Sequence, residues 1–501
     1  NPSSELGGMF TFSVVAFPGK SLEEMETMVR KSILEFEFRG VTDDDLTRFK
    51  ASYEASEIQG LASVSGKASK LAYYQTFTGN PGYIKEDLAR YANVTKEDVM
   101  RVYNTYIKDK HGVILSVVPK EQSNFVAGTD NYEIPTSGYV EKNTLQYDTL
   151  VYNKANDNFD RSMRPSAGAN PVVEVPEYWK TTFANGLKVI GTVNDELPTT
   201  TIQLSVPAGH RYETTDKAGI ATLMAGMLEE KTQNYTAEEI QEKLEKLGAN
   251  IWINSGSDNV SITISTLTKN LDEVIPLAEQ MIFKPAFAQE DFDRLKSQQL
   301  EAIANQATSA DVIANNNFNQ LLYGKNSIKG VPSMGTEASV ASISLKDVQG
   351  YYNTHFGQDG AKLVVVADLS QDEVLPKLLP FINWEGNTTA KPALPEAPEF
   401  GETKIYLIDK ENAPQSEVRI GYLTNMVYNP LGEHFKATAM NYTLGGAFNS
   451  RINLNLREDK GYTYGARSRF SGGKGPGAFS AGAAVRGDAT AASIKEFMSE
   501  I

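Results

Sequence analysis

Residues 444–465, LGGAFNSRINLNLREDKGYTYG, decide how the rest of the chain is interpreted. The Gly-Gly pair predicts a turn, and the apolar residues after it predict a short amphipathic helix. These apolar residues are Ile452, Leu454 and Leu456. Polar residues and a glycine at 459–461 predict the end of the helix, and the alternating Tyr462 and Tyr464 predict a strand after it.

Arg457 and a tyrosine a few residues later are the candidate functional side chains of this stretch. On one strand, a spacing of seven would point Arg457 and Tyr464 to opposite faces. They can therefore converge only because a helix-to-strand turn lies between them. Tyr462 lies two residues before Tyr464 on the same expected strand face and is the alternative tyrosine.

Composition excludes several classes of protein. The net charge of −15 and a sequence pI near 5.0 disfavour a nucleic-acid partner or an anionic membrane surface. No run of about 18 apolar residues is present, so no membrane span is expected. The absence of cysteine excludes thiol nucleophiles, disulfides and thiolate metal ligands. Composition leaves the compartment open, and a periplasmic or cell-envelope location is favoured over the cytoplasm.

The periodicity of apolar residues divides the chain into α+β segments, and 501 residues suggest about three domains. Residues 1–119 are expected to form one domain, and residues 120–177 have no sustained period and predict an extended linker. Residues 178–385 and 386–501 form the next two domains, separated by a proline-rich stretch. Both ends of the chain look cut within a domain.

The expected strands are apolar, β-prone runs and the expected helices have 3.6-residue periodicity or capping boxes. The expected strands are 9–17, 112–118, 188–192, 201–207, 251–255, 260–267, 361–367, 404–408 and 417–422. The expected helices are 21–38, 43–59, 67–77, 95–106, 217–230, 236–248, 271–282, 288–308, 345–355, 431–442 and 490–501.

Two pairs of segments indicate an internal repeat. DLTRFK at 45–50 resembles DFDRLK at 291–296, and DVMRVYNT at 98–105 resembles DVQGYYNT at 347–354. Because both matches occur at nearly the same offset, successive domains share one fold. A longer period, of about 470 residues, relates the two ends of the chain. We infer two similar halves, each of two similar domains.

These residues resemble the pitrilysin/insulinase-type (inverzincin) zinc metallopeptidases, whose two halves close like a clamshell around a peptide. The resemblance rests on LGG at 444–446, LRE at 456–458, the G-x-x-Y that ends at Tyr464, and GLKV at 186–189. It covers 178–501 well and 9–118 more weakly. It implies the C-terminal portion of a bacterial-type member, with each domain a mostly antiparallel sheet packed against helices.

In that family an H-x-x-E-H helix holds zinc and activates water. This sequence has no such motif, and its histidines are far apart. They are His111, His210, His355 and His434. The resemblance places Thr222, Ala225 and Gly226 at the ligand and base positions, and Glu301 alone near the place of the distal ligand. We therefore expect no catalytic or metal-binding residue in this chain, with zinc held by an upstream domain of the full-length protein.

By the same resemblance, Arg457 and Tyr464 match an arginine–tyrosine pair that reaches the substrate backbone near the scissile bond. A guanidinium and a phenol can both donate to a peptide carbonyl and to the oxyanion that develops on it. The competing interpretation is that Arg457 pairs with Glu458 or Asp459 while the tyrosines pack in a sheet.

Two functions follow from the resemblance. The first is the substrate-binding portion of a zinc-dependent endopeptidase that cleaves peptides in a closed chamber, inactive as this fragment alone. The alternative is a non-catalytic peptide-binding or assembly subunit that pairs with a separate active peptidase. The expected partners are a peptide or unfolded polypeptide and a catalytic half or subunit.

Overall fold

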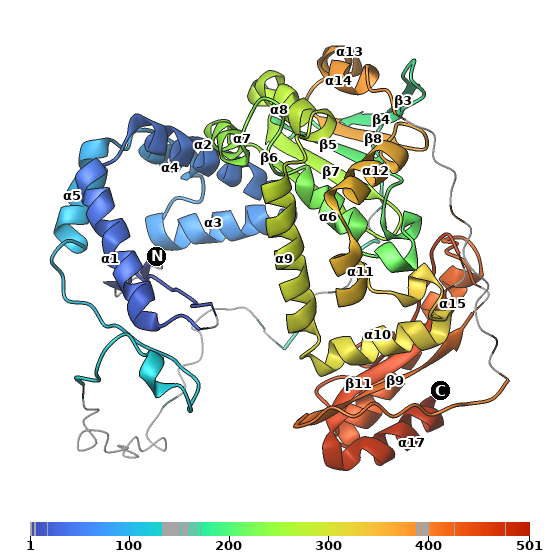
Figure 1. Cartoon of the computed structure of the whole chain (residues 1–501). Helices are drawn as coiled ribbons and strands as arrows, with labels where there is room; N and C mark the ends of the chain where they lie inside the picture. The colour runs from blue at the N-terminus through green and yellow to red at the C-terminus, as the bar shows by residue number, and fades with distance from the viewer. Residues whose placement is uncertain are drawn as a thin grey trace. The chain divides into compact units, whose positions relative to one another are not determined.

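The computed structural model describes residues 3–4, 7–17, 19–132, 151, 160, 162–163, 166, 168–170, 172–386, 392, 399, 401–424, 426–475 and 477–501 (Figure 1). The chain forms two compact units. The first comprises Asn1–Lys50 and Lys85–Pro176, and the second comprises Ala51–Ile84 and Glu177–Ile501. The proline-rich stretch at 391–398 lies almost entirely outside the described residues.

Helices form most of the regular structure of the first unit and of residues 51–84, which belong to the second unit. They are α1 (Leu22–Arg39), α2 (Asp43–Gly60), α3 (Val64–Thr78), α4 (Ile84–Ala92) and α5 (Lys96–Tyr106). The capping box at Ser21 begins α1 as expected, with Glu24 N–H donating to Ser21 Oγ. Tyr103 of α5 is 7% exposed and donates its hydroxyl to Glu37 of α1 at 2.7 Å.

Two expected strands of the first unit are wrong. Residues 9–17 and 112–118 are described but form no strand. Their apolar side chains stay exposed: Val15 is 93% exposed and Val113 97%. A strand needs a neighbour for its backbone groups, and no other described segment pairs with either run. The described strands of this region are the two-residue β1 (Ser3–Ser4) and β2 (Gly7–Gly8).

The second unit contains a six-stranded, mostly antiparallel sheet of order β3-β4-β8-β5-β7-β6. Its strands are β3 (Trp179–Thr182), β4 (Lys188–Val193), β5 (Thr199–Val206), β6 (Asn250–Ser255), β7 (Val260–Leu267) and β8 (Lys362–Ala367). Of the neighbouring pairs, β4 and β8 run parallel and the others run antiparallel. Burial alternates along β4, β5 and β8, so one face of the sheet is in the core and the other is open.

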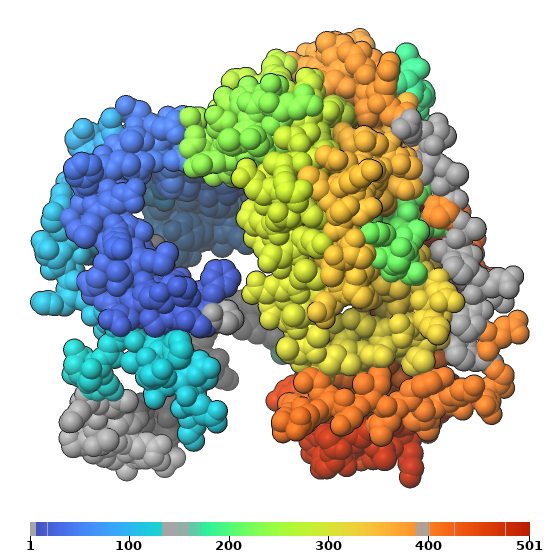
Figure 2. Space-filling view, viewed as in Figure 1, coloured from blue at the N-terminus to red at the C-terminus, as the bar shows by residue number. Residues whose placement is uncertain are grey.

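Helices cover the buried face of this sheet (Figure 1). The helices of this region are α6 (Ile220–Met227), α7 (Ala237–Lys246), α8 (Leu271–Phe283), α9 (Gln289–Gln306), α11 (Glu337–Ser342) and α12 (Leu345–His355). Leu204, Ile262 and Met224 are fully buried in the core between sheet and helices. Figure 2 shows α9 and α12 at the surface of this helical side. None of the helices in the described part of the chain has the length and apolar content that a membrane crossing needs.

A second, smaller core lies around a three-stranded sheet of order β10-β11-β9. Its strands are β9 (Gln415–Leu423), β10 (Arg467–Phe470) and β11 (Ala478–Arg486), and it is accompanied by α15 (Glu433–Asn441) and α17 (Thr490–Glu500). The expected strand at 404–408 is wrong: these residues form no ladder, and Leu407 is 95% exposed. Helix α10 (Ala310–Tyr323), which the sequence did not predict, contacts β9, and Arg419 there donates to Asn315 Oδ1 at 2.9 Å.

The local part of the predicted repeat is confirmed. Residues 45–50 lie in α2 and 291–296 in α9, which are both 18-residue helices. Each contains the same ion pair, Asp45 with Arg48 at 3.0 Å and Asp291 with Arg294 at 3.1 Å. The other pair of segments begins α5 and α12, and both helices start with a capping box.

Candidate functional site

The stretch at 444–465 is mostly helical before it reaches the sheet. A π-helical turn (Tyr442–Gly446) is followed by α16 (Arg451–Asn453), which continues as a second π-helical turn (Leu454–Asp459). The predicted helix is thus confirmed, and Ile452 and Leu456 are fully buried. Leu454 is 40% exposed, because residues two apart point to different sides of a helix.

Gly445 is required by a close approach between this stretch and β10. A Cβ at Gly445 would lie 2.2 Å from Ser468 Oγ and 2.5 Å from Ser468 N. Ser468 in turn donates its hydroxyl to Asn441 Oδ1 at 2.6 Å, and Asn441 Nδ2 donates to Ser468 O at 2.7 Å. The conformation of the Gly-Gly turn therefore depends on backbone contact with the sheet.

Asn453 joins the two ends of the stretch. Its side chain is fully buried, and Nδ2 donates to Phe448 O at 2.7 Å. Its Oδ1 accepts from Ala466 N–H at 3.0 Å. One amide side chain thus fixes both the loop that precedes the helix and the segment that leads into β10.

Arg457 lies on the exposed side of this helix. Its guanidinium carbon is 4.6 Å from the centre of the Phe448 ring, and Nε is 3.1 Å from Glu458 Oε1. The side chain is 36% exposed. The pairing with Glu458 is the competing interpretation from the sequence. Stacking on Phe448 leaves the remaining guanidinium N–H groups available as donors.

The strand expected to begin at Tyr462 is wrong, since β10 begins at Arg467. Residues 461–466 form a connection in which Thr463 Oγ1 donates to Ala484 O at 2.6 Å. Tyr464 is 91% exposed, whereas Tyr462 is half-buried. Among the described residues, no hydrogen bond or ring contact joins Arg457 to either tyrosine, and the partners of Arg457 are Phe448 and Glu458. The pairing of Arg457 with a tyrosine stays a prediction.

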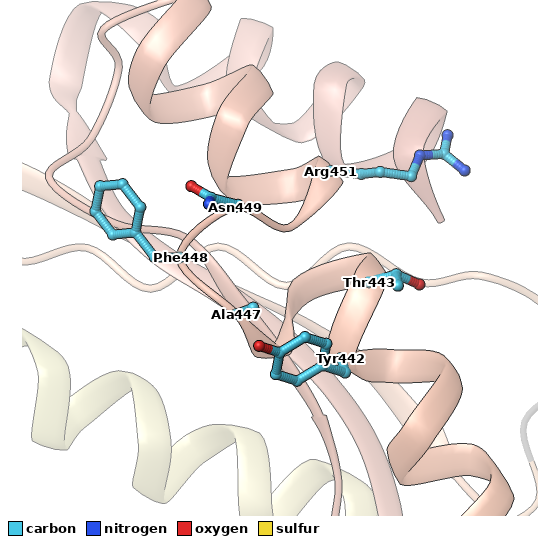
Figure 3. A pocket seen from close by; sticks show the side chains of 6 residues that line it. All are labelled: Tyr442, Thr443, Ala447, Phe448, Asn449 and Arg451. Atoms are coloured by element: carbon cyan, nitrogen blue, oxygen red, sulfur yellow. The ribbon is translucent and has the colours of Figure 1, made fainter. Parts of the chain in front are cut away.

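A hollow of about 480 Å³ lies on the surface of this stretch, lined by the first π-helical turn, the loop after it and the start of α16. Its lining residues are Tyr442, Thr443, Ala447, Phe448, Asn449 and Arg451 (Figure 3). Tyr442 is 65% exposed and Phe448 48%. The sequence reasoning missed this hollow. The available signal was an aromatic residue in the polar loop directly after the Gly-Gly turn.

The sequence resemblance places the zinc-binding helix at α6, and the residues there do not fit a zinc ion. Ala225 is 3% exposed and has no donor atom in its side chain, and Gly226 packs against Leu295. Thr222 donates its hydroxyl to Ser333 O at 3.3 Å, and Glu301 is exposed on α9. No group of three or more His, Asp or Glu side chains suited to a metal ion occurs among the residues that the structure describes.

A buried ion pair lies at the beginning of α6. His210 Nδ1 is 2.6 Å from Glu213 Oε2, and its Nε2 is 2.9 Å from the carbonyl oxygens of Ile328 and Val331. Glu213 also accepts from the N–H groups of Gly219 and Ala221. Burial is the largest single influence and lowers the pKa of His210, but the hydrogen bond to Glu213, the charge of that carboxylate and the hydrogen bonds to the two carbonyl oxygens together raise it. This pair positions α6.

Two family profiles match the second unit. Residues 189–330 match "Insulinase (Peptidase family M16)", and residues 342–501 match "Peptidase M16 inactive domain". The non-peptidase homolog YmxG of Helicobacter pylori is 25% identical over 287 residues, which are 56% of this chain and 65% of that protein. The uncharacterized zinc protease YmxG of Bacillus subtilis is 24% identical over 292 residues, 58% of this chain and 69% of that protein.

Mitochondrial-processing peptidase subunit beta of Bos taurus is 24% identical over 239 residues, which are 48% of either chain. The match thus spans less than two thirds of the Helicobacter relative and about half of the mitochondrial one. Among solved structures, the peptidase M16 inactive domain from Pseudomonas fluorescens has a TM-score of 0.57 at 20% identity, covering 64% of this chain and 78% of that one. A protease from Helicobacter pylori has a TM-score of 0.59 at 18% identity, covering 65% and 79%. The fold is therefore shared.

Proposed function

This chain belongs to the insulinase-type (pitrilysin-type) peptidase family, M16, and from that premise we propose that it is the substrate-binding, C-terminal portion of a zinc-dependent endopeptidase. The metal site and the hydrolytic chemistry are assigned to a domain outside these 501 residues. The substrate is a peptide or an unfolded polypeptide held in a closed chamber. The proposed location is the periplasm or cell envelope.

The observation that carries this proposal is the stacking of Arg457 on Phe448, and we call the surface formed by these two side chains the Arg457 surface. Asn453 fixes the loop at Phe448, and the Phe448 ring supports the Arg457 guanidinium. Tyr464 is the proposed second donor, and its side chain is almost completely exposed. A guanidinium fixed against a ring loses little conformational freedom when it donates to a peptide carbonyl, which favours binding.

Two findings support the proposal that the full-length protein binds zinc, and the residues of α6 place that site outside this helix. The family matched by residues 189–330 is a peptidase family, and the Bacillus subtilis relative is named a zinc protease. Thr222, Ala225 and Gly226 supply no ligand set for zinc, so no hydrolytic step is derived for α6. The role of this chain in such an enzyme is to bind and orient polypeptide.

A second candidate is a non-catalytic subunit that binds peptide or assembles with a separate active peptidase. The name of the Helicobacter pylori relative, a non-peptidase homolog, favours it. So does the match of residues 342–501 to the inactive domain of the family. The sequence upstream of Asn1 separates the two candidates: an H-x-x-E-H motif there supports the first, and a polypeptide with no such motif supports the second.

The test measures binding of a fluorescein-labelled, neutral, unstructured peptide by anisotropy. Removing a charged donor costs about 1.5–3 kcal/mol, so Arg457→Gln is expected to weaken binding roughly 10- to 150-fold. Tyr464→Phe removes a neutral donor and is expected to cost up to about tenfold. Arg486→Gln is the matched control, because Arg486 forms an exposed ion pair with Asp488 in the same sheet domain.

Equal affinity of Arg457→Gln, Tyr464→Phe and the native chain would refute the assignment of this surface. Cleavage of a quenched peptide by the isolated chain, with zinc bound to it, would refute both candidates, since neither places hydrolysis in these residues.

A further inference from the structure

The open face of the six-stranded sheet is a second feature of the same unit that the Arg457 surface does not explain. Register pairs place Lys188 beside Lys362 and Ile190 beside Val364, and these side chains all point away from the helices. On the same face, Val364 is the register partner of Gln203 on β5, and Thr263 of β7 links Gln203 to Trp252 on β6. Gln203 and Trp252 are also exposed. We use "open face" for the exposed side of strands β3 to β8.

The charge of the open face is opposite to that of the whole chain. The net charge of the chain is −15, yet none of the six strands contains an aspartate or a glutamate. The open face instead carries Lys180, Lys188 and Lys362 on three neighbouring strands. Beyond the end of β4, the carboxylate of Glu196 is paired with Lys67. The face is therefore a basic surface in an acidic protein.

The lysines are placed where they repel one another. Lys188 and Lys362 are direct register partners on adjacent strands, which lie about 5 Å apart. Neither forms an ion pair with any residue in the described part of the chain. Like charges opposite each other destabilise a sheet, and departures from local rules without compensation tend to mark functional surfaces. An anionic partner would supply the missing compensation.

The rest of the open face suits an extended chain. Between the lysines and the far edge, β5, β7 and β6 present threonine, serine, glutamine and asparagine side chains that can hydrogen-bond to a backbone. Aromatic residues lie at both edges: Trp252 is 46% exposed, and Tyr178 is 56% exposed with Lys180 Nζ 4.9 Å from its ring centre. Five strand spacings span about 24 Å, the length of roughly seven extended residues.

We propose that the open face binds an acidic, extended polypeptide segment, with Lys188 and Lys362 contacting its carboxylates. The proposal rests on the proposed function, because it takes polypeptide as the ligand and adds a preference for acidic segments. A second copy of the chain is a poorer occupant, since each copy has a net charge of −15. At one corner of the open face, Gln59 of α2 donates to Ser265 of β7 at 3.3 Å and covers that part of the sheet. We therefore place the bound acidic segment over β3, β4 and β8, which carry the lysines.

The test compares two fluorescein-labelled eight-residue peptides, one of alternating Glu and Ser and one of alternating Gln and Ser. In low salt, the native chain is expected to bind the acidic peptide at least tenfold more tightly. The variant K188Q/K362Q is expected to lose this preference. The matched control K231Q/K346Q removes the same charge from exposed lysines on the helical side and is expected to keep it. Circular dichroism checks that both variants remain folded.

Each outcome separates this inference from the proposed function. If R457Q weakens the Gln/Ser peptide but the native chain shows no acidic preference, the inference is overturned and the proposed function stands. If the acidic preference is present and lost only in K188Q/K362Q while R457Q has no effect, the inference stands and the Arg457 surface fails. If K188Q/K362Q changes the sedimentation of the chain and leaves peptide affinity unchanged, the occupant is a second copy and the inference is overturned.

Discussion

Substitution of Asn453 tests whether one buried amide holds the candidate site together. In Asn453→Ala, the Ala466 N–H group is left buried without an acceptor, which costs about 1–3 kcal/mol. Phe448 is about half exposed, so its carbonyl oxygen can accept a hydrogen bond from water. Loss of the hydrogen bond from Asn453 Nδ2 to this oxygen therefore costs about 0.5–1.5 kcal/mol. The sum is a destabilisation of about 1.5–4.5 kcal/mol in the smaller core.

Asn453→Asp separates the two hydrogen bonds by pH. The carboxylate keeps an acceptor for Ala466 but faces the Phe448 carbonyl, and only the protonated form can donate to that oxygen. Burial therefore raises the folded-state pKa of this new carboxyl above its unfolded value of about 3.9. Stability relative to the native chain is then highest below about pH 4 and is lost as pH rises through the folded-state pKa.

Hydrogen exchange is the appropriate assay, because the chain has two separate cores and one unfolding transition is not expected. Faster exchange is expected at 461–470 in Asn453→Ala, with no change in the six-stranded sheet. Asn326→Ala, in an exposed loop, is the control and should change stability by less than about 0.5 kcal/mol. Unchanged exchange at Ala466 in Asn453→Ala, or a pH-independent Asn453→Asp variant, would refute the reasoning.

Two further substitutions test other parts of the second unit. Gly445→Ala should destabilise the smaller core by about 1–3 kcal/mol, because Ser468 N cannot move away from the new methyl group. Hydrogen exchange in β10 and β11 would show this as faster exchange, whereas Gly350→Ala, where a Cβ meets nothing within 4 Å, should leave exchange in α12 unchanged or slower. His210→Gln should cost about 3 kcal/mol at pH 6 by breaking the pair with Glu213. The folded-state pKa of His210 is raised, so the stability that the charged imidazole contributes is complete below about pH 6.5 and is lost as pH rises through the folded-state pKa. The loss of unfolding free energy in His210→Gln should therefore be larger at pH 6 than at pH 9. The opposite order would contradict the ion pair with Glu213.

The parts of the fold that could be predicted from the sequence depend on interactions between residues that are close together along the chain. The capping boxes at Ser21, Thr95 and Thr236 use a hydroxyl and a carboxylate three residues apart, so the sequence alone defines them. The repeat was also visible for this reason, since Asp45 with Arg48 and its counterpart in α9 are pairs within one turn. The strands β4 to β8 were found because one face is buried and the apolar pattern alternates.

The site was predicted in its residues and missed in its geometry. The motif located Arg457, Tyr462 and Tyr464, but not the ring of Phe448 under the guanidinium. Arg457 lies in a π-helical turn, where side chains are shifted relative to a regular 3.6-residue helix, and the loop at Phe448 is held by Asn453. No periodicity argument specifies a π-helical turn, so neither this contact nor the hollow lined by Phe448 could be predicted from the sequence.

The unpaired runs at 9–17, 112–118 and 404–408 show why strand prediction failed where helix prediction succeeded. A helix satisfies its own backbone hydrogen bonds, so a capped periodic sequence is sufficient evidence for it. A β-prone run reports only that its side chains would fit a pleated, half-buried surface. Whether a strand forms depends on a neighbour elsewhere in the chain, as β9 has in β11 and Leu407 does not have among the described residues. Val113 and Leu407 are therefore exposed because no described segment pairs with their runs, although the sequence pattern of both runs is that of strands.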